Sequence, residues 1–468
     1  MQFTIQIAVA DESGHSHTET LFRVEKQSDT PNDIGLSLSE SKLLLNAIQQ
    51  SVIQKQAAEY LSEHRACPHC QRNRRIKGKQ TILYRTLFGI IPVEGFRVYR
   101  CACEKHSTHT VSLLNNWCDT HTHPELRYIE TRWASLMSYG LTANLLKDIL
   151  PVGERCNAAT VRNHLCQTAK RQEAELDGLP DFLPGDPREW EKLPKPGKPM
   201  AVGIDGGYVR NRDDRKHHFE IIAGKSFSAT VPAKRFGFVQ CLENHPRRKL
   251  LAQLSSQGMQ ANQQITFLSD GADNLRDLQF NLYPESQHVL DWFHITMRLT
   301  VLKQYAKGVS KNAPELGAEL LDVLTSTKWS IWHGNVDKAL EYLDHCALIC
   351  DDDTLHYENH KSLLKHLDEM YTYIENNSMM IPNYGEMYRY GEPISSSFVE
   401  SAINEVIAKR MVKKQQMQWS QQGAHYLLQT RTAVLNNDLK ARFEHWYPGI
   451  KLGEETERYL TEAEAIAA

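Results

Sequence analysis

The sequence has no long apolar run, few cysteines and little net charge, and each absence narrows the possible functions. No stretch approaches the roughly 18 apolar residues that a membrane helix needs, so no membrane partner is expected. The opening residues, MQFTIQIAVADESG, lack a basic segment followed by an apolar one, so we expect no secretory signal and a cytoplasmic location. The ten cysteines are too irregularly spaced for a disulfide scaffold, and in a reducing compartment paired cysteines favour metal binding.

The net charge of −3 gives no nucleic-acid signal for the whole chain, but positive charge is concentrated between residues 65 and 105. Ten Lys or Arg lie there against two acids, a local excess of +8. Such a patch is typical of a surface that contacts DNA phosphates, and the alternative is a solvated basic face. The densest part of the patch comprises Arg72, Arg74, Arg75 and Lys77.

The chain is long enough for two or three domains, and its prolines indicate one boundary. Six of the 18 prolines lie between residues 180 and 199 and predict a linker. The pattern of elements then predicts these regions: N-terminal strands and helix, 1–64; zinc ribbon, 65–123; helical DNA-binding region, 124–175; linker, 176–199; catalytic core, 200–294 and 391–450; all-α insertion, 295–390; acidic tail, 451–468.

The order of elements after the linker predicts an α/β fold of the RNase H-like type. Apolar patterning indicates three adjacent strands, then a helix, a strand, a helix and a strand. The predicted strands are 200–210, 217–229, 235–243, 264–272 and 287–295, with helices at 246–259 and 274–284.

Two aspartates follow apolar strand segments and precede glycines. Asp205 lies in the segment GIDGGY and Asp270 in FLSDG. Ligands collect at strand ends of open α/β sheets, and in the predicted strand order these two strands are neighbours. We therefore expect the two carboxylates to face each other.

A third acid is expected from a helix after the insertion, over residues 395–411. Glu400 lies at the margin of the apolar stripe of this helix. Glu405 points about 140° away at 100° per residue, which predicts a solvated side chain. Glu400 is therefore the better candidate for the third ligand.

Three neighbouring carboxylates repel one another unless cations occupy the site. Mg²⁺, or Mn²⁺ in its place, takes carboxylate oxygens. Two such ions about 3.5–4 Å apart can activate the attacking oxygen and stabilise the leaving oxygen in phosphodiester chemistry. The alternative is that each acid is an ordinary capping or turn residue.

Four segments together resemble the bacterial insertion-sequence transposases of the ISKra type. They are GIDGGYVR (203–210), LSDGADNLRDLQ (268–279), LDWFHITMRLTVL (290–302) and SSFVESAINEVIAKRMVKKQQMQWS (396–420). The resemblance implies a bacterial, nucleoid-associated DDE transposase that cuts DNA at element ends and joins the 3′-hydroxyls to target DNA. It also implies the catalytic triad Asp205, Asp270 and Glu400.

The segment Asp291-Trp292-Phe293-His294 is similar to the acid-x-x-His motif of Mutator-like and hAT transposases. Asp291 and His294 are candidates for positioning the insertion or the scissile phosphate, and His294 for proton transfer. Trp292 is a candidate for stacking on an unpaired base. The alternative is a structural Asp–His pair and a core tryptophan.

Two basic residues after Glu400 are candidates for the contact with the scissile phosphate. Related transposases often carry one seven positions after the catalytic glutamate, where this chain has Ile407. The nearest basic residues are Lys409 and Arg410, which either line a DNA groove or form a solvated face.

Two cysteine pairs predict a structural zinc ribbon. They are Cys67 with Cys70 and Cys101 with Cys103, and four thiolates suit tetrahedral Zn²⁺. The second pair is tightly spaced, so His106 or His109 is an alternative ligand. Unbound reduced thiols are the other possibility.

Residues 127–171 predict a helix-turn-helix, broken near Gly140 and residues 151–153. Its recognition helix opens at residues 157–164 and presents Arg162, and a plain helix pair is the alternative. The leading hypothesis is thus a transposase that binds DNA, as a homodimer or higher oligomer because two ends must be held. A nuclease without strand transfer and a domesticated DNA-binding protein are the alternatives.

Overall fold

The computed structural model divides into two compact units of mixed α/β structure. The first comprises Met1–Thr168 with Asn437–Ala468, and the second comprises Ala169–Asn436. None of the helices in the described ranges is long and apolar enough to cross a membrane. The structure describes residues 1–10, 16–27, 31–103, 109–118, 120–180, 185–196, 200–228, 231–282, 286–351, 357–395, 403–412 and 417–452.

The first unit begins with an antiparallel pair of strands and a long helix. Strand β1 (Gln2–Ala10) pairs with β2 (Ser16–Glu25), and a 3₁₀ turn, η1 (Pro31–Asp33), leads to α1 (Leu38–Glu63). A capping box begins α1: the Ser37 side chain accepts from the Glu40 amide, and the Glu40 carboxylate accepts from the Ser37 amide.

A three-stranded antiparallel sheet packs against α1 and carries the core of this unit. Strands β3 (Ile76–Thr86) and β4 (Gly89–Tyr99) form a long hairpin, and β5 (Thr110–Ser112) leads into α2 (Leu113–Trp117). Side chains of α1 such as Ile53 and Leu61 are buried against Val93, Val98 and Leu114. This packing fixes both ends of the segments that carry the cysteines.

Four helices complete the first unit: α3 (Pro124–Leu136), α4 (Tyr139–Ile149), the start of α5 (Ala158–Asp177), and α16 (Asp438–Trp446), which returns from the C-terminal part of the chain. Tyr128 of α3 packs edge-on against Phe443 of α16. The break expected near Gly140 lies instead at residues 137–138, because the Ser138 side chain caps α4.

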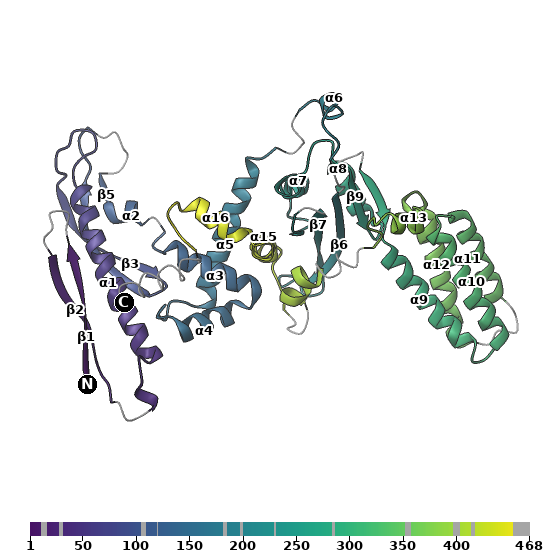
Figure 1. Ribbon diagram of the computed structural model, residues 1–468, viewed down its shortest axis with the longest axis horizontal. Helices are drawn as coiled ribbons and strands as arrows, with labels where there is room; N and C mark the ends of the chain where they lie inside the picture. The colour runs from purple at the N-terminus through teal and green to yellow at the C-terminus, as the bar shows by residue number, and fades with distance from the viewer. Residues whose placement is uncertain are drawn as a thin grey trace, which may run out of the picture. The chain divides into compact units, whose positions relative to one another are not determined.

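The second unit is built on a five-stranded sheet in the order β10-β9-β6-β7-β8 (Figure 1). Strands β6, β7 and β8 are successively antiparallel, while β9 lies parallel to β6 and β10 parallel to β9. The strands are β6 (Met200–Arg210), β7 (His218–Ser228), β8 (Lys234–Val239), β9 (Ile265–Ser269) and β10 (Gln287–Leu290). A short helix, α6 (Pro187–Trp190), lies in the proline-rich segment before them.

The two faces of the sheet are covered by different parts of the chain. Alternate residues such as Ile204 and Phe267 pack against α7 (Pro246–Ser256) and α8 (Asp273–Leu282). On the opposite face glycines allow close approach: a Cβ at Gly207 would lie 2.9 Å from Ile407 Cδ1. Ile407 belongs to η3 (Asn404–Val412), which together with α15 (Gln421–Leu435) covers this face.

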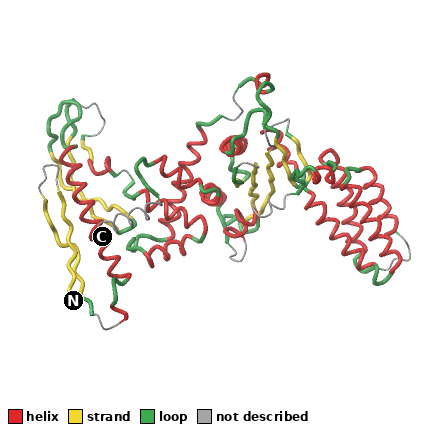
Figure 2. Tube along the Cα trace, viewed as in Figure 1, coloured by secondary structure: helices red, strands yellow, loops and turns green. Residues whose placement is uncertain are grey.

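Helices alone make up the described elements between β10 and residue 395 (Figure 2). Helices α9, α10, α11 and α12 close a bundle, in which α9 contacts α10 and α12, and α11 contacts the same two helices. Their core is continuous with Leu268 and Leu290 of the sheet. The bounds are α9 (Trp292–Val309), α10 (Pro314–Trp332), α11 (Val336–Cys350), α12 (His360–Asn376), η2 (Ser378–Met380) and α13 (Tyr384–Arg389).

The fifth strand, predicted over 287–295, ends at Leu290. Asp291 caps the following helix by accepting a hydrogen bond from the Phe293 amide at 2.9 Å. The helix therefore begins at Trp292, and the prediction that the strand continues to residue 295, which considered only the apolar residues, is wrong.

Candidate functional site

Three aspartates lie level with one another on neighbouring parallel strands. Asp270 and Asp291 directly follow β9 and β10, and Asp205 lies in the middle of β6. Gly203 of β6 pairs with Leu268 of β9, so Asp205 and Asp270, each two residues further on, lie level with each other. Ser269 of β9 pairs with Leu290 of β10, which places Asp291 level with Asp270. The prediction that the strands of Asp205 and Asp270 are neighbours is confirmed.

The electrostatics of Asp205 reflect this crowding. Burial raises the pKa of Asp205, and the negative charges of Asp270 and Asp291 raise it further. Opposing contributions come from His294 and from the Gly206 amide, which donates to Asp205 Oδ1 at 2.7 Å. The arrangement disfavours the charged form of the buried Asp205 carboxylate.

Asp291 and His294 form a pair at the start of α9. The Asp291 side chain is fully buried, and its Oδ2 lies 3.4 Å from Nε2 of His294, which is 27% exposed. Since Asp291 also caps α9, it fixes both the helix and the imidazole beside the aspartate row. The pair can orient a proton-carrying ring toward solvent.

The helical bundle reaches the ends of the same strands, which the sequence did not indicate. The Tyr373 hydroxyl of α12 donates to the Asp270 carbonyl at 3.0 Å, and the Tyr384 hydroxyl donates to the Leu290 carbonyl at 2.6 Å. Gly271 has φ +88°, and a Cβ there would lie 2.3 Å from Oδ1 of buried Asn377. The backbone that carries Asp270 and Asp291 is therefore held by the bundle.

Glu400, the predicted third ligand, lies outside the described residues, so its position relative to Asp205 and Asp270 stays a prediction. The segment that follows is wound as a π-helix rather than an α-helix. The prediction that Glu405 is solvated is wrong: its carboxylate accepts from Arg235 Nε at 2.6 Å and is 31% exposed. The angular argument considered only the helix itself and overlooked Arg235, which lies on β8, 170 residues earlier in the chain.

Buried arginines surround η3. Arg431 of α15 is 3% exposed and donates from Nε to the carbonyls of Glu405 and Val406 at 3.1 and 3.0 Å. Burial, together with the nearby positive charge of Arg410, lowers the pKa of Arg431 to about 10. Arg431 thus ties α15 to the carbonyls of η3.

The structure separates the two candidate phosphate contacts after Glu400. Lys409 is exposed, whereas Arg410 is 4% exposed and its guanidinium lies 5.1 Å from the centre of the Trp419 ring. Of the two, Lys409 presents its charge to solvent. Trp292 packs against Trp332 and Tyr384 with ring centres 4.9 Å away in each case, which favours the core alternative for this tryptophan.

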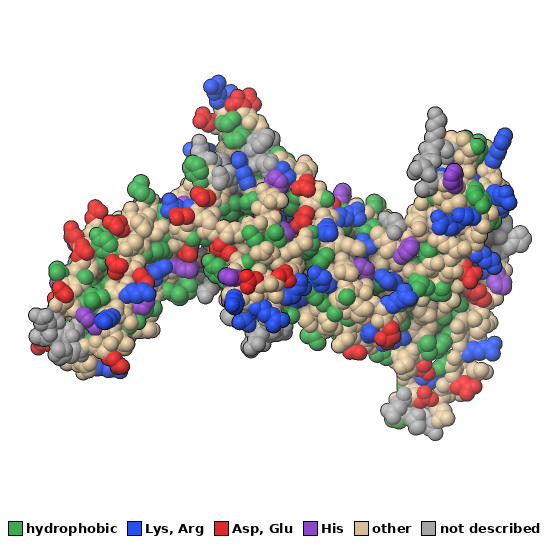
Figure 3. Space-filling view, turned by 180° about the vertical axis from the view of Figure 1, so that it is seen from behind, with side chains coloured by type: hydrophobic (Ala, Val, Ile, Leu, Met, Phe, Trp, Pro, Cys, Tyr) green, Lys and Arg blue, Asp and Glu red, His purple; other side chains and the backbone are tan. Residues whose placement is uncertain are grey.

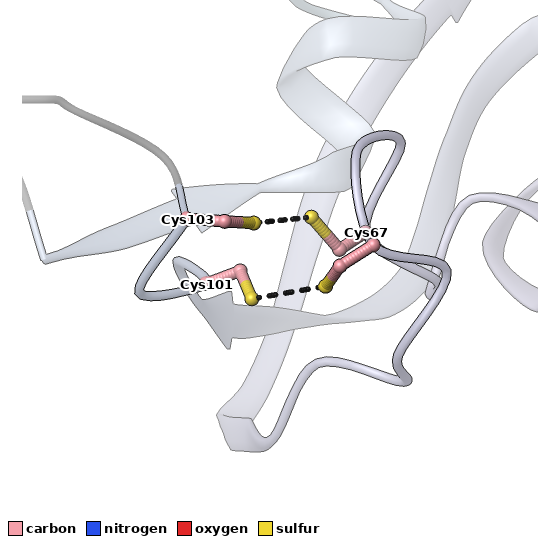
Figure 4. A group of neighbouring side chains, drawn as sticks. Cys67, Cys101 and Cys103 are labelled. Atoms are coloured by element: carbon pink, nitrogen blue, oxygen red, sulfur yellow. Dashed lines mark hydrogen bonds between the residues drawn. The ribbon is translucent and has the colours of Figure 1, made fainter.

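The four paired cysteines come together in the first unit (Figure 4). Cys67 Sγ lies 3.4 Å from Cys103 Sγ, and Cys70 Sγ lies 3.4 Å from Cys101 Sγ. All four sulfurs lie within 4.8 Å of one another, and in the described part of the chain this is the only group of three or more potential ligands so close. Asp205, Asp270 and Asp291, all among the described residues, do not form such a group with one another.

The cysteine cluster fits a tetrahedral metal. Zn–S bonds of about 2.3 Å put the sulfurs of a regular tetrahedron about 3.8 Å apart, close to the observed spacing. The pKa of Cys101 is lowered to about 7, which eases formation of a thiolate. The largest cause is a hydrogen bond from the Cys103 backbone, and smaller contributions come from the Cys103 and Cys70 thiols. The cluster is compatible with structural zinc without a histidine; His106 lies outside the described residues.

The basic residues around the cysteines are not equivalent. Arg72, Arg75 and Lys77 are exposed. Arg74 donates from its guanidinium to the His64 carbonyl at 2.8 Å and so holds the loop. On the face of the molecule that Figure 3 draws, Lys and Arg side chains are intermixed with Asp and Glu, in keeping with the small net charge.

The predicted recognition helix is α5. Asn157 Oδ1 accepts from the amides of Ala159 and Thr160 at 3.0 Å, and Arg162 is exposed one turn later. The buried side of α5 holds a pair that the sequence did not indicate, in which His164 Nδ1 contacts the Glu130 carboxylate. This pair locks α5 onto α3.

No family model matches the chain, and a search of curated proteins finds no match either.

Proposed function

We propose that the protein is a DDE-type DNA transposase whose second unit is an RNase H-like catalytic core. One observation carries the proposal: the sheet order β8-β7-β6-β9-β10, with β7 antiparallel and with Asp205 of β6 level with Asp270 and Asp291, which follow β9 and β10. This order is the one expected of an RNase H-like sheet. Acids at the ends of its central strands are where a metal-dependent phosphodiester reaction would be carried out.

In this proposal Asp205 and Asp270 hold divalent ions, and Glu400 is the expected third ligand. Mg²⁺ or Mn²⁺ would activate the attacking oxygen and stabilise the leaving oxygen. The raised pKa of Asp205 supports a cation site, because a bound ion offsets the neighbouring negative charges. Asp291 positions His294, whose half-buried imidazole can accept a proton near the row.

The first unit would bind DNA. A zinc ribbon built on Cys67, Cys70, Cys101 and Cys103 would hold the exposed cations Arg72, Arg75 and Lys77 on a rigid loop. Arg162, which is exposed on α5, would contact a DNA groove. We further propose a homodimer or higher oligomer on DNA, because transposition joins two ends.

The test is metal-dependent excision from a plasmid that carries the gene with its flanking DNA. Asp205→Asn and Asp270→Asn should abolish cleavage while leaving DNA binding intact. Asp273→Asn is the matched control, since it removes the same charge three residues from Asp270 at a side chain that is 93% exposed. Full activity of Asp205→Asn would reject the proposal.

A strand-transfer reaction with pre-cut ends separates transposase from nuclease. Joined products support transposition, and hydrolysis alone would assign the chain to the nucleases. DNA binding without any cleavage would favour a domesticated DNA-binding protein.

A further inference from the structure

Helix α9 continues beyond His294 with a cation on the same face. Asp291, His294 and Arg298 are spaced by three and four residues, which places them along one side of the helix. Arg298 is exposed, and among the described residues no carboxylate lies within ion-pair distance of it. The nearby Glu369 is paired with His366 at 3.0 Å.

A tyrosine holds this cation near the aspartates. The Arg298 guanidinium carbon lies 4.2 Å from the centre of the Tyr373 ring. The Tyr373 hydroxyl donates to the Asp270 carbonyl at 3.0 Å. Stacking on a ring restrains the planar guanidinium but leaves its edge N–H groups available. The contacts run from Asp270 through Tyr373 to Arg298, so the cation has a defined place relative to the carboxylate row.

The chemistry of the row requires such a cation. Asp205, Asp270 and Asp291 repel a DNA phosphate as well as one another, and a divalent ion offsets only part of that charge. A guanidinium binds two phosphate oxygens in a fixed planar geometry. Neither Arg410, which is buried on Trp419, nor Arg235, which is paired with Glu405, is free to do this.

We propose that Arg298 binds a backbone phosphate of the DNA strand beside the carboxylate row, so that the helical bundle supplies part of the active site. The inference rests on the proposed function. The bundle then acts in two ways, because Tyr373 and Tyr384 hold the strand ends and Arg298 binds the substrate. Tyr373 is a positioning residue, since it contacts both the Asp270 backbone and the Arg298 guanidinium.

The experiment measures the affinity for mixed-sequence duplex DNA as a function of salt concentration. Arg298→Gln should weaken binding severalfold and reduce the magnitude of the slope of log K against log salt by about one, the effect of one lost phosphate contact. Lys307→Gln is the matched control, because this exposed lysine lies nine residues further along α9 and thus on the opposite side. It should change neither quantity. Urea unfolding of each variant checks that the fold is kept.

Two tyrosine variants separate the roles. Tyr373→Leu should reproduce the loss of slope, because the guanidinium loses its support. Tyr373→Phe keeps the ring and should preserve DNA affinity and slope while slowing cleavage. An unchanged slope in folded Arg298→Gln overturns the inference, even if Asp205→Asn abolishes cleavage. If the wild type binds DNA but never cleaves it, a reduced slope in Arg298→Gln still supports the phosphate contact while the proposed chemistry fails.

Discussion

Replacing Gly271 by alanine tests the contact between the helical bundle and the strand that carries Asp270. Gly271 has φ +88°, where an alanine costs about 1–2 kcal/mol relative to glycine. The new Cβ would also lie 2.3 Å from Asn377 Oδ1 and 2.9 Å from Leu290 Cδ1. Asn377 is 6% exposed and its Nδ2 donates to the Tyr373 carbonyl at 2.8 Å, so it has little room to move. Overpacking of this kind costs about 1–3 kcal/mol more.

The control is Gly258→Ala. Gly258 has φ +82°, but a Cβ there meets nothing within 4 Å, so only the backbone cost applies. Urea unfolding should show Gly271→Ala less stable than Gly258→Ala by about 1–3 kcal/mol, and only Gly271→Ala should slow metal-dependent cleavage. Equal losses of stability would refute the packing of α12 on the Asp270 loop.

Two further predictions concern the zinc cluster and the pH dependence of stability. Cys67→Ser should lower the zinc content from about one ion per chain and remove most of the stability of the first unit, because structural zinc contributes about 10 kcal/mol or more. The control Cys118→Ser, in the core of the same unit, should keep the metal. Equal zinc content in the two variants would contradict a metal site at the four cysteines. Burial, aided by Arg276, lowers the pKa of His288 from 6.5 to about 4, so its contribution is complete above pH 6.5 and is lost as pH falls toward 4, by on the order of 3 kcal/mol. The melting temperature, measured across this pH range, should fall less steeply with acid in His288→Gln than in the wild type. An unchanged pH dependence would assign the acid sensitivity to another group.

The elements of the sheet were the most predictable part of the fold. Strand β6 has the bounds predicted, 200–210. The neighbouring positions of Asp205 and Asp270 followed from strand order alone. Strand bounds depend on the residues of the strand itself, and the strand order is one that many α/β folds share.

The site was only partly predictable because its remaining contacts join distant residues. Tyr373 meets Asp270 across 103 residues, and no periodic pattern indicates that contact. The pairing of Glu405 with Arg235 was missed because the two residues lie 170 positions apart in the chain. Arg298 had a usable signal, since it lies seven residues after Asp291 and so on the same helix face.

The most direct measurement is the anomalous scattering of Mn²⁺ in crystals of the protein bound to DNA and grown with zinc. The account predicts a manganese peak between the carboxylates of Asp205 and Asp270, with zinc at the four cysteines as an internal reference. A zinc peak with no manganese at those aspartates would contradict the proposed active site.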